Sequence, residues 1–143
     1  MRPSTNSPRN EPDVAEELAI ISDADVVRVR QAVRTLAVEA RLSVVDQTKI
    51  VTAASELARN ALIHGGGGRA ELSLIQEAGK TGVRASFSDN GSGIGDITVA
   101  LAGGISTAGG LGLGLSGSKR LVDLFDLKTG SDGTRVTVTK WKR

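Results

Sequence analysis

The pattern of hydrophobic and polar positions predicts a strand followed by a helix in the first part of the chain. Residues 17–21 form a short, mostly apolar run that is typical of a strand. Ser22, with Asp25 three residues later, has the spacing of a capping box, which satisfies free backbone N–H groups at the start of a helix. We therefore expect a helix that runs from here to about Arg41.

The next part of the chain predicts a second helix and a β-hairpin. Ser43 and Asp46 repeat the capping signal, and apolar residues follow at helical spacing until the glycine run 65–68 ends the pattern. Residues 70–76 and 83–89 predict two strands separated by turn-forming residues.

The last part of the chain predicts helices and two more strands. A short helix near residues 97–101 lies within a glycine-rich region, and residues 113–125 have a helical pattern. Strands follow at 127–130 and 134–141. This order of elements predicts an α/β protein in which one mixed or antiparallel sheet is covered by helices on one face.

Composition and charge narrow the class of protein. A chain of 143 residues suits one domain, and the polar residues 1–12 predict a disordered lead ahead of a domain at 13–143. The net charge is +2 with both signs interspersed, so we expect no nucleic-acid partner. The chain has no cysteine, no signal-peptide pattern and no apolar run of the roughly 18 residues that span a membrane. We expect a cytoplasmic protein without a membrane partner.

Glycine is enriched in the region that follows the predicted hairpin, where Asp89 is a candidate binding residue. Asp89 continues the apolar side of its strand, so its carboxylate needs a hydrogen-bond donor. Gly91 and Gly93 follow at once and let a ligand approach the backbone closely. The amino group of a nucleotide base is a suitable donor. The alternative is a plain turn formed by Asp89, Asn90 and Gly91.

Glu56 and Asn60 are candidates for a metal and phosphate site on the second helix. They are four residues apart and share a helix face. The amide oxygen of Asn60 can join the coordination shell of Mg²⁺, and Glu56 can accept a proton from an attacking hydroxyl. A solvated helix face is the alternative. His64, the only histidine, is interpreted as a helix-end residue and not as a metal ligand.

A glycine-rich run that leads into the last helix is a candidate phosphate cradle, because bare backbone N–H groups at a helix start bind anions. Its residues are Gly110, Leu111, Gly112, Leu113 and Gly114. A dinucleotide-binding fingerprint is excluded because no strand precedes the run, and a P-loop is excluded because no lysine stands at the required place. The alternative is a mobile loop without a ligand.

Thr134 is a weaker candidate at the start of the last strand. It shares the apolar face with Val136 and Val138 and follows a glycine turn, so its hydroxyl can reach the same pocket as Asp89. The alternative is an ordinary strand threonine.

Taken together and in this order, the candidates resemble the nucleotide-binding boxes of the GHKL superfamily of ATPases and kinases. The resemblance implies a two-layer α/β sandwich with a mixed, mostly antiparallel sheet and ATP held between the sheet, the helices and a lid. It implies that Asn60 binds Mg²⁺, Asp89 the adenine amino group and the 110–114 backbone the phosphates. It also implies that Gly91 and Gly93 let the nucleotide approach and that Thr134 supports the adenine.

Within the superfamily, residues 54–60 and 106–115 are similar to the switch serine kinases of bacterial stress-signalling complexes. This likeness implies transfer of the γ-phosphate of ATP to a serine of a STAS-domain antagonist, with Glu56 as general base, and later activation of a PP2C-type phosphatase through its regulatory domain. Residues 60–65 are also similar to anti-sigma-factor kinases, so nucleotide-dependent binding of a sigma factor stays an alternative. The ATPase half of a histidine kinase is disfavoured, because the N-terminal segment is too short for a dimerisation helix with a phosphoacceptor histidine.

Overall fold

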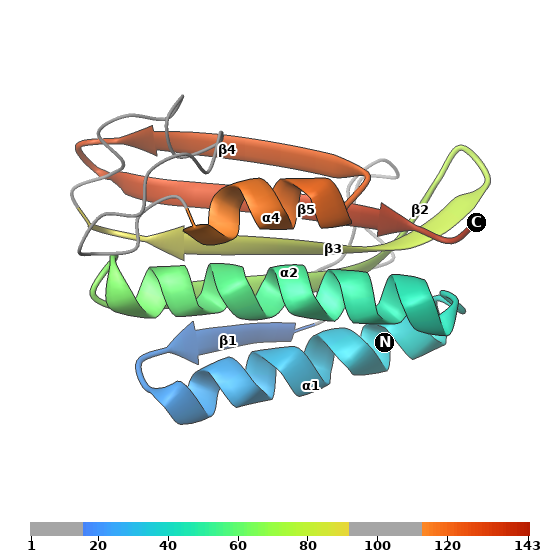
Figure 1. Ribbon diagram of the computed structural model, residues 1–143, viewed down its shortest axis with the longest axis horizontal. Coiled ribbons are helices and arrows are strands. Elements are labelled where there is room, and N and C mark those ends of the chain that lie inside the picture. Colours follow the sequence, from blue (N-terminus) through green and yellow to red (C-terminus); the bar gives the residue numbers. More distant parts are fainter. Residues whose placement is uncertain (1–15, 92–112) are drawn as a thin grey trace, which may run out of the picture.

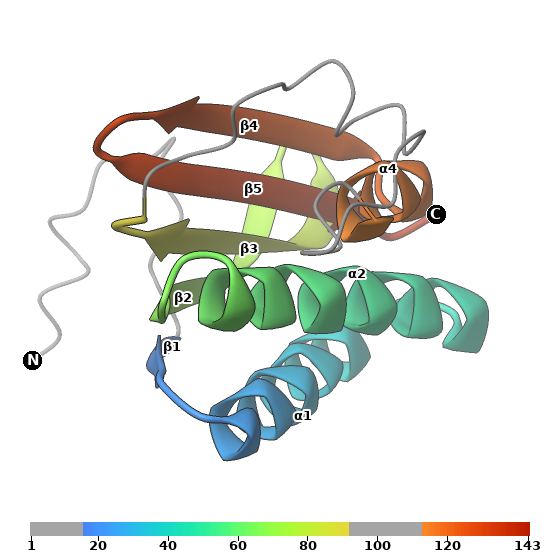
Figure 2. The same cartoon turned by 60° about the vertical axis from the view of Figure 1, so that its left-hand side comes forward.

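The computed structural model describes residues 16–91 and 113–143, and there helices lie on one face of a five-stranded sheet (Figure 1). The strands are β1 (Glu16–Ile20), β2 (Gly68–Glu77), β3 (Lys80–Asp89), β4 (Leu124–Gly130) and β5 (Gly133–Trp141). The helices are α1 (Asp23–Glu39), α2 (Val44–Ile63) and α4 (Leu113–Leu121). The strand order is β1-β2-β3-β5-β4, and every neighbouring pair is antiparallel. The turned view shows the two layers edge-on, which confirms the predicted α/β class (Figure 2).

The first two helices begin and end where their sequence signals predict. The Asp25 carboxylate accepts the backbone N–H of Ser22 at 3.1 Å, and Ser43 Oγ accepts the N–H of Asp46 at 3.1 Å. At the other end of α2, the N–H of His64 donates to the carbonyl of Asn60 at 2.8 Å. His64 is therefore the C-cap residue, as expected. No helix within the described ranges is long and apolar enough to cross a membrane.

The expected helix over residues 113–125 is wrong in its last four residues. The helix α4 ends at Leu121, and Leu124 already begins β4. Phe125 pairs with Val138 of β5 and turns its half-buried side chain toward the core. Pairing with β5 satisfies the backbone here and outweighs the local helical pattern. The helix predicted near 97–101 and the lead at 1–12 lie outside the described residues.

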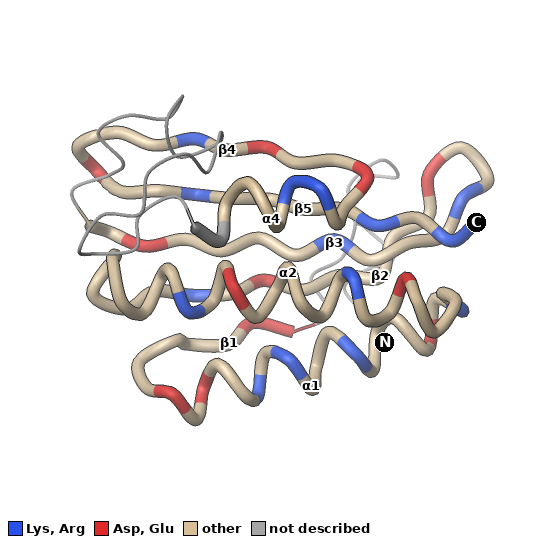
Figure 3. Tube along the Cα trace, in the orientation of Figure 1, with Lys and Arg blue, Asp and Glu red and all other residues tan. Residues whose placement is uncertain are grey.

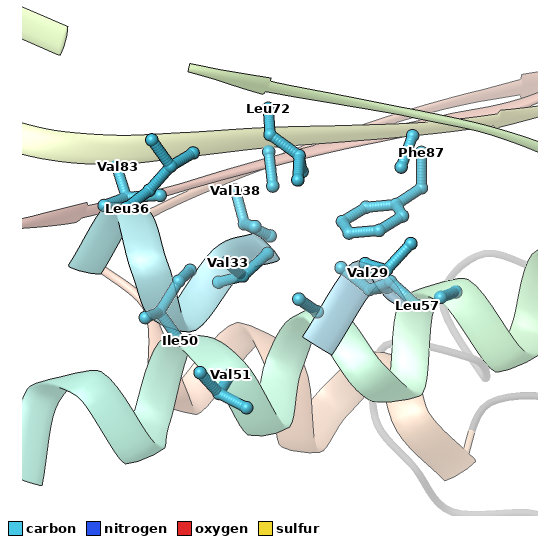
Figure 4. Packing of buried hydrophobic residues seen from close by; sticks show 14 of the residues in the cluster. Val29, Val33, Leu36, Ile50, Val51, Leu57, Leu72, Val83, Phe87 and Val138 are labelled. Atoms are coloured by element: carbon cyan, nitrogen blue, oxygen red, sulfur yellow. The ribbon is translucent and has the colours of Figure 1, made fainter. Parts of the chain in front are cut away.

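The core between the helices and the sheet is mainly aliphatic, and Figure 4 shows its centre. Val29 and Val33 of α1 and Leu57 of α2 face the sheet and are almost completely buried. They meet Leu72 of β2 and Val138 of β5. Burying an aliphatic side chain of this size contributes about 1.5–3 kcal/mol, so the contact holds the helices against the sheet.

A buried ionic cluster ties the end of β5 to the start of α2 and to the turn before β4. Lys140 Nζ lies 3.6 Å from an oxygen of Asp46 and 3.6 Å from an oxygen of Asp123. The N–H of Trp141 donates to Asp123 at 2.7 Å, and Arg143 pairs with both carboxylates from the solvent side. Because a buried lysine is costly unless it is paired, the cluster fixes β5 relative to α2.

The cluster predicts a pH dependence of folding stability. Burial alone would raise the pKa of Asp123, but the Trp141 N–H and the charges of Lys140 and Arg143 outweigh it and lower the pKa below its usual value. The folded state therefore binds this proton less readily than the unfolded chain. The stabilisation is present above the unfolded pKa of about 3.9 and is lost as the pH falls through the folded value.

We expect the free energy of unfolding of the wild type, measured with urea, to decrease below about pH 4–5. In Asp123→Asn this decrease should be smaller. Asp126→Asn is the control, because Asp126 is exposed and has no ion pair within the described ranges. If the free energy of unfolding decreased equally with falling pH in the wild type and in Asp123→Asn, Asp123 would be ruled out as a source of the pH dependence.

Candidate functional site

The structure brings Asp89 and Thr134 together at one end of the sheet. They are directly opposite each other in the β3–β5 register, and both side chains belong to the face that carries the helices. Oδ1 of Asp89 accepts the N–H of Gly91 at 2.8 Å, while Oδ2 makes no hydrogen bond within the described ranges. Thr134 Oγ1 lies 2.8 Å from Oγ1 of Thr129. The carboxylate is thus oriented by its own chain and keeps an oxygen for a further donor.

Two glycines from distant segments form the walls around Asp89. A Cβ atom at Gly65, just after α2, would lie 2.4 Å from Cγ of Asp89. A Cβ atom at Gly133 would lie 2.0 Å from the backbone oxygen of Asp89, and Gly133 has φ +132°. Both distances are far below any real contact of a Cβ atom, so glycine at 65 leaves room for the carboxylate and glycine at 133 leaves room for the backbone of Asp89.

Sequence reasoning missed the part that Gly65 plays, because it treated the glycine run 65–68 only as the end of a helix. The likeness of residues 60–65 to anti-sigma-factor kinases was the one signal at this position. Spacing along the chain could not show that Gly65 contacts Asp89.

A cavity of about 720 Å³ opens beside Asp89, which is within the usual range for small-molecule sites. Its lining includes the Gly65–Gly68 loop, Ile20, Ile21 and Asn90. A second cavity of about 360 Å³ also has Asp89 in its lining, together with Thr134 and Gly133. Asp89 is among the lining residues of both cavities.

Glu56 and Asn60 lie on one face of α2, as predicted, and both are half-buried. Oε1 of Glu56 is 3.2 Å from NH1 of Arg59. Neither side chain is part of the hydrophobic core, so both can meet a ligand from solvent. Asn60 lies five residues before Gly65. The helix α2 therefore leads from the candidate metal and phosphate site, Glu56 and Asn60, to the glycine that contacts Asp89.

The predicted phosphate cradle is described only at its end. Leu113 and Gly114 are the first residues of α4, which runs alongside α2 (Figure 1; Figure 2). Gly93, Gly110, Leu111 and Gly112 lie outside the described residues. Leu113 and Gly114 are therefore helical, while anion binding by the glycine run stays a prediction.

The described residues contain no group of three or more His, Cys, Asp or Glu side chains that could hold a metal ion by themselves. The amide oxygen of Asn60 is a neutral ligand of the kind that a metal can share with the oxygens of a bound nucleotide and of water. This donor set suits Mg²⁺, which commonly takes few protein ligands together with nucleotide phosphates and water. Figure 3 shows lysine and arginine interspersed with aspartate and glutamate over the described part of the chain, and the expectation of no nucleic-acid partner stays a prediction.

Comparison with known proteins adds to this geometry. The model of the family described as "Histidine kinase-like ATPase domain" matches residues 22–140. The chain is 42% identical over 125 residues to "Serine/threonine-protein kinase RsbT" of Bacillus subtilis (strain 168), a match that covers 87% of this chain and 94% of that protein.

Two solved structures share the fold. The crystal structure of the RsbU and RsbW domains of Rv1364c from Mycobacterium tuberculosis is similar with a TM-score of 0.59 and 24% identity, over 90% of this chain and 33% of that chain. The histidine kinase domain of the blue-light activated histidine kinase from Erythrobacter litoralis EL346 is similar with a TM-score of 0.54 and 20% identity, over 82% of this chain and 63% of that chain. At these identities the likeness is one of fold.

Proposed function

Because the chain belongs to the family of histidine kinase-like ATPase domains and is an RsbT-like, ATP-dependent serine/threonine-protein kinase, we propose that it phosphorylates a serine of a separate STAS-domain antagonist. The observation that carries the proposal is the carboxylate of Asp89, which lies against Gly65 and has one oxygen left for a donor. This is the arrangement that recognition of an adenine amino group needs. The proposal places the protein in the cytoplasm, where ATP is available.

In the proposed complex the nucleotide lies between Asp89 and α2. Asp89 accepts from the adenine amino group, Thr134 supports the base, and Gly91 and Gly93 leave room for it. The glycine-rich 110–114 backbone holds the phosphates. Asn60 joins Mg²⁺, which when bound neutralises charge on the phosphate oxygens.

Glu56 is the proposed general base for phosphoryl transfer. Its carboxylate accepts the proton of the serine hydroxyl while the serine oxygen forms a bond to the γ-phosphorus. The bond from the γ-phosphorus to the bridging oxygen breaks, and ADP leaves. The partial exposure of Glu56 on α2 supports this role, because a protein acceptor has to approach from solvent.

Release of the partner follows from the charge of the product. A phosphoserine carries about −1.5 to −2 and would stand near Glu56 and the phosphates of ADP, so repulsion weakens the complex. The freed kinase would then activate a PP2C-type phosphatase through its regulatory domain.

The similarity of residues 60–65 to anti-sigma-factor kinases supports the second candidate, nucleotide-dependent binding of a sigma factor.

We expect the chain to transfer one phosphate to its cognate STAS protein and then to separate from it in Mg²⁺-ATP. Intact-mass spectrometry and size-exclusion chromatography with Mg²⁺-ATP, compared with a non-hydrolysable analogue, measure both events. A complex that persists equally in both nucleotides, without phosphoserine on the partner, would contradict the switching kinase. Nucleotide-dependent co-elution of the chain with a sigma factor, added in place of the STAS protein, would favour the second candidate.

A further inference from the structure

Arg59 contacts the proposed general base. Its NH1 atom lies 3.2 Å from Oε1 of Glu56, which is three residues earlier and almost one helical turn away. Neither side chain makes another hydrogen bond or ion pair within the described ranges. Asn60, the proposed metal ligand, directly follows Arg59 in the chain. Arg59 is thus a cation that contacts the proposed general base and neighbours the proposed metal ligand in the chain.

Other cations lie farther along the helices. Lys49 of α2 is seven residues, or two turns, before Glu56. In α4, which packs against α2, Lys119 and Arg120 are exposed in the last turn and make no ion pair within the described ranges. Within the described ranges, Arg59 is the cation that contacts Glu56.

The contact adds little to folding stability. The side chains of Arg59 and Glu56 are 49% and 42% exposed, and ion pairs of this kind on a helix surface are weak in water. It does restrict the carboxylate, because a guanidinium bound to one oxygen limits the rotamers of a flexible glutamate. The contact occupies Oε1 and leaves Oε2 for a proton.

We propose that Arg59 is a positioning residue for phosphoryl transfer: it holds Glu56 so that Oε2 faces the attacking serine hydroxyl. This inference rests on the proposed function of Glu56. Orientation of a reacting group makes a large contribution to enzymatic rates, and small misplacements are costly. Arg59 therefore affects the rate of transfer and has no part in the affinity for ATP.

A different role for the same side chain would be direct contact with the transferred phosphoryl group. The guanidinium would then stabilise the developing negative charge without involving Glu56. The two roles make opposite predictions for a double variant. A group that acts only through Glu56 has no further effect once Glu56 is replaced, whereas independent groups have effects that multiply.

The experiment measures single-turnover transfer from Mg²⁺-ATP to the STAS partner, with ATP affinity by calorimetry. The variants are Arg59→Gln, Arg59→Lys, Glu56→Gln and the double variant Glu56→Gln with Arg59→Gln. Arg28→Gln is the matched control, because it removes a bridge of the same spacing, Arg28 to Asp25, from α1. Circular dichroism checks that each variant is folded.

We expect Arg59→Gln to slow transfer by about tenfold at unchanged ATP affinity, Arg59→Lys to recover part of the rate and Arg28→Gln to match the wild type. The double variant should be no slower than Glu56→Gln alone. A wild-type rate in Arg59→Gln, a loss of ATP affinity or a further loss in the double variant overturns the positioning role. If the folded wild-type chain transfers no phosphate, the proposed function fails and the role of Arg59 fails with it.

Discussion

Replacing Glu56 with glutamine is expected to slow phosphoryl transfer by about 10²–10⁴, the usual contribution of a positioned general base. The amide keeps the size of the side chain but cannot accept the serine proton in the same way. ATP affinity should stay near the wild-type value, because Glu56 is not part of the proposed nucleotide contacts. Quenched single-turnover transfer to the STAS partner and calorimetry with Mg²⁺-ATP measure the two quantities.

Two further variants make this result specific. Glu39→Gln is the matched control, because Glu39 is an exposed glutamate at the end of α1 without an ion pair in the described ranges. Asn60→Ala should instead weaken the metal-dependent part of nucleotide binding. If Glu56→Gln transferred phosphate at the wild-type rate, the general base would have to be another group.

The second large effect is expected where Asp89 meets Gly65. Asp89→Asn removes a charged acceptor for the adenine amino group, and a charged hydrogen bond is worth about 1.5–3 kcal/mol, or roughly 10- to 150-fold in the dissociation constant of ATP. Gly65→Ala should cause a comparable loss of ATP affinity, although it does not change the Asp89 side chain itself. The methyl group of the new alanine would lie 2.4 Å from Cγ of Asp89, so the carboxylate has to move away from the adenine.

Calorimetry with ATP measures both losses, and thermal unfolding checks that the variants are folded. Gly117→Ala is the control substitution, because a Cβ atom there meets nothing within 4 Å and Gly117 lines neither of the two cavities. Wild-type ATP affinity in a folded Asp89→Asn variant would remove Asp89 from the adenine site. Unchanged affinity in Gly65→Ala alone would show that the carboxylate can bind from a shifted position.

The elements of the fold could largely be predicted from the chain because their signals are local. The pairs Ser22 with Asp25 and Ser43 with Asp46 mark helix starts through bonds that span only three residues. The alternation of apolar residues along β3 shows which face is buried for the same reason. The prediction was wrong at Leu124 and Phe125, where pairing with β5 outweighs the local helical pattern.

The candidate site was partly predictable. Glu56 and Asn60 share a helix face because of the helical repeat, and the order of the motifs indicated an ATP-binding fold. The amino-acid sequence by itself therefore determined the elements, the family and most candidate residues, since each depends on neighbours in the chain.

Only the tertiary structure decided that Asp89 lies against Gly65 and that Lys140 joins Asp46 to Asp123. These contacts join segments far apart in the sequence, so they depend on the order and register of the strands and on the packing of α2 against the sheet. Local spacing carries no information on such distances. A carboxylate can be recognised from its strand, but the glycine that makes room for it is found only when the chain is folded.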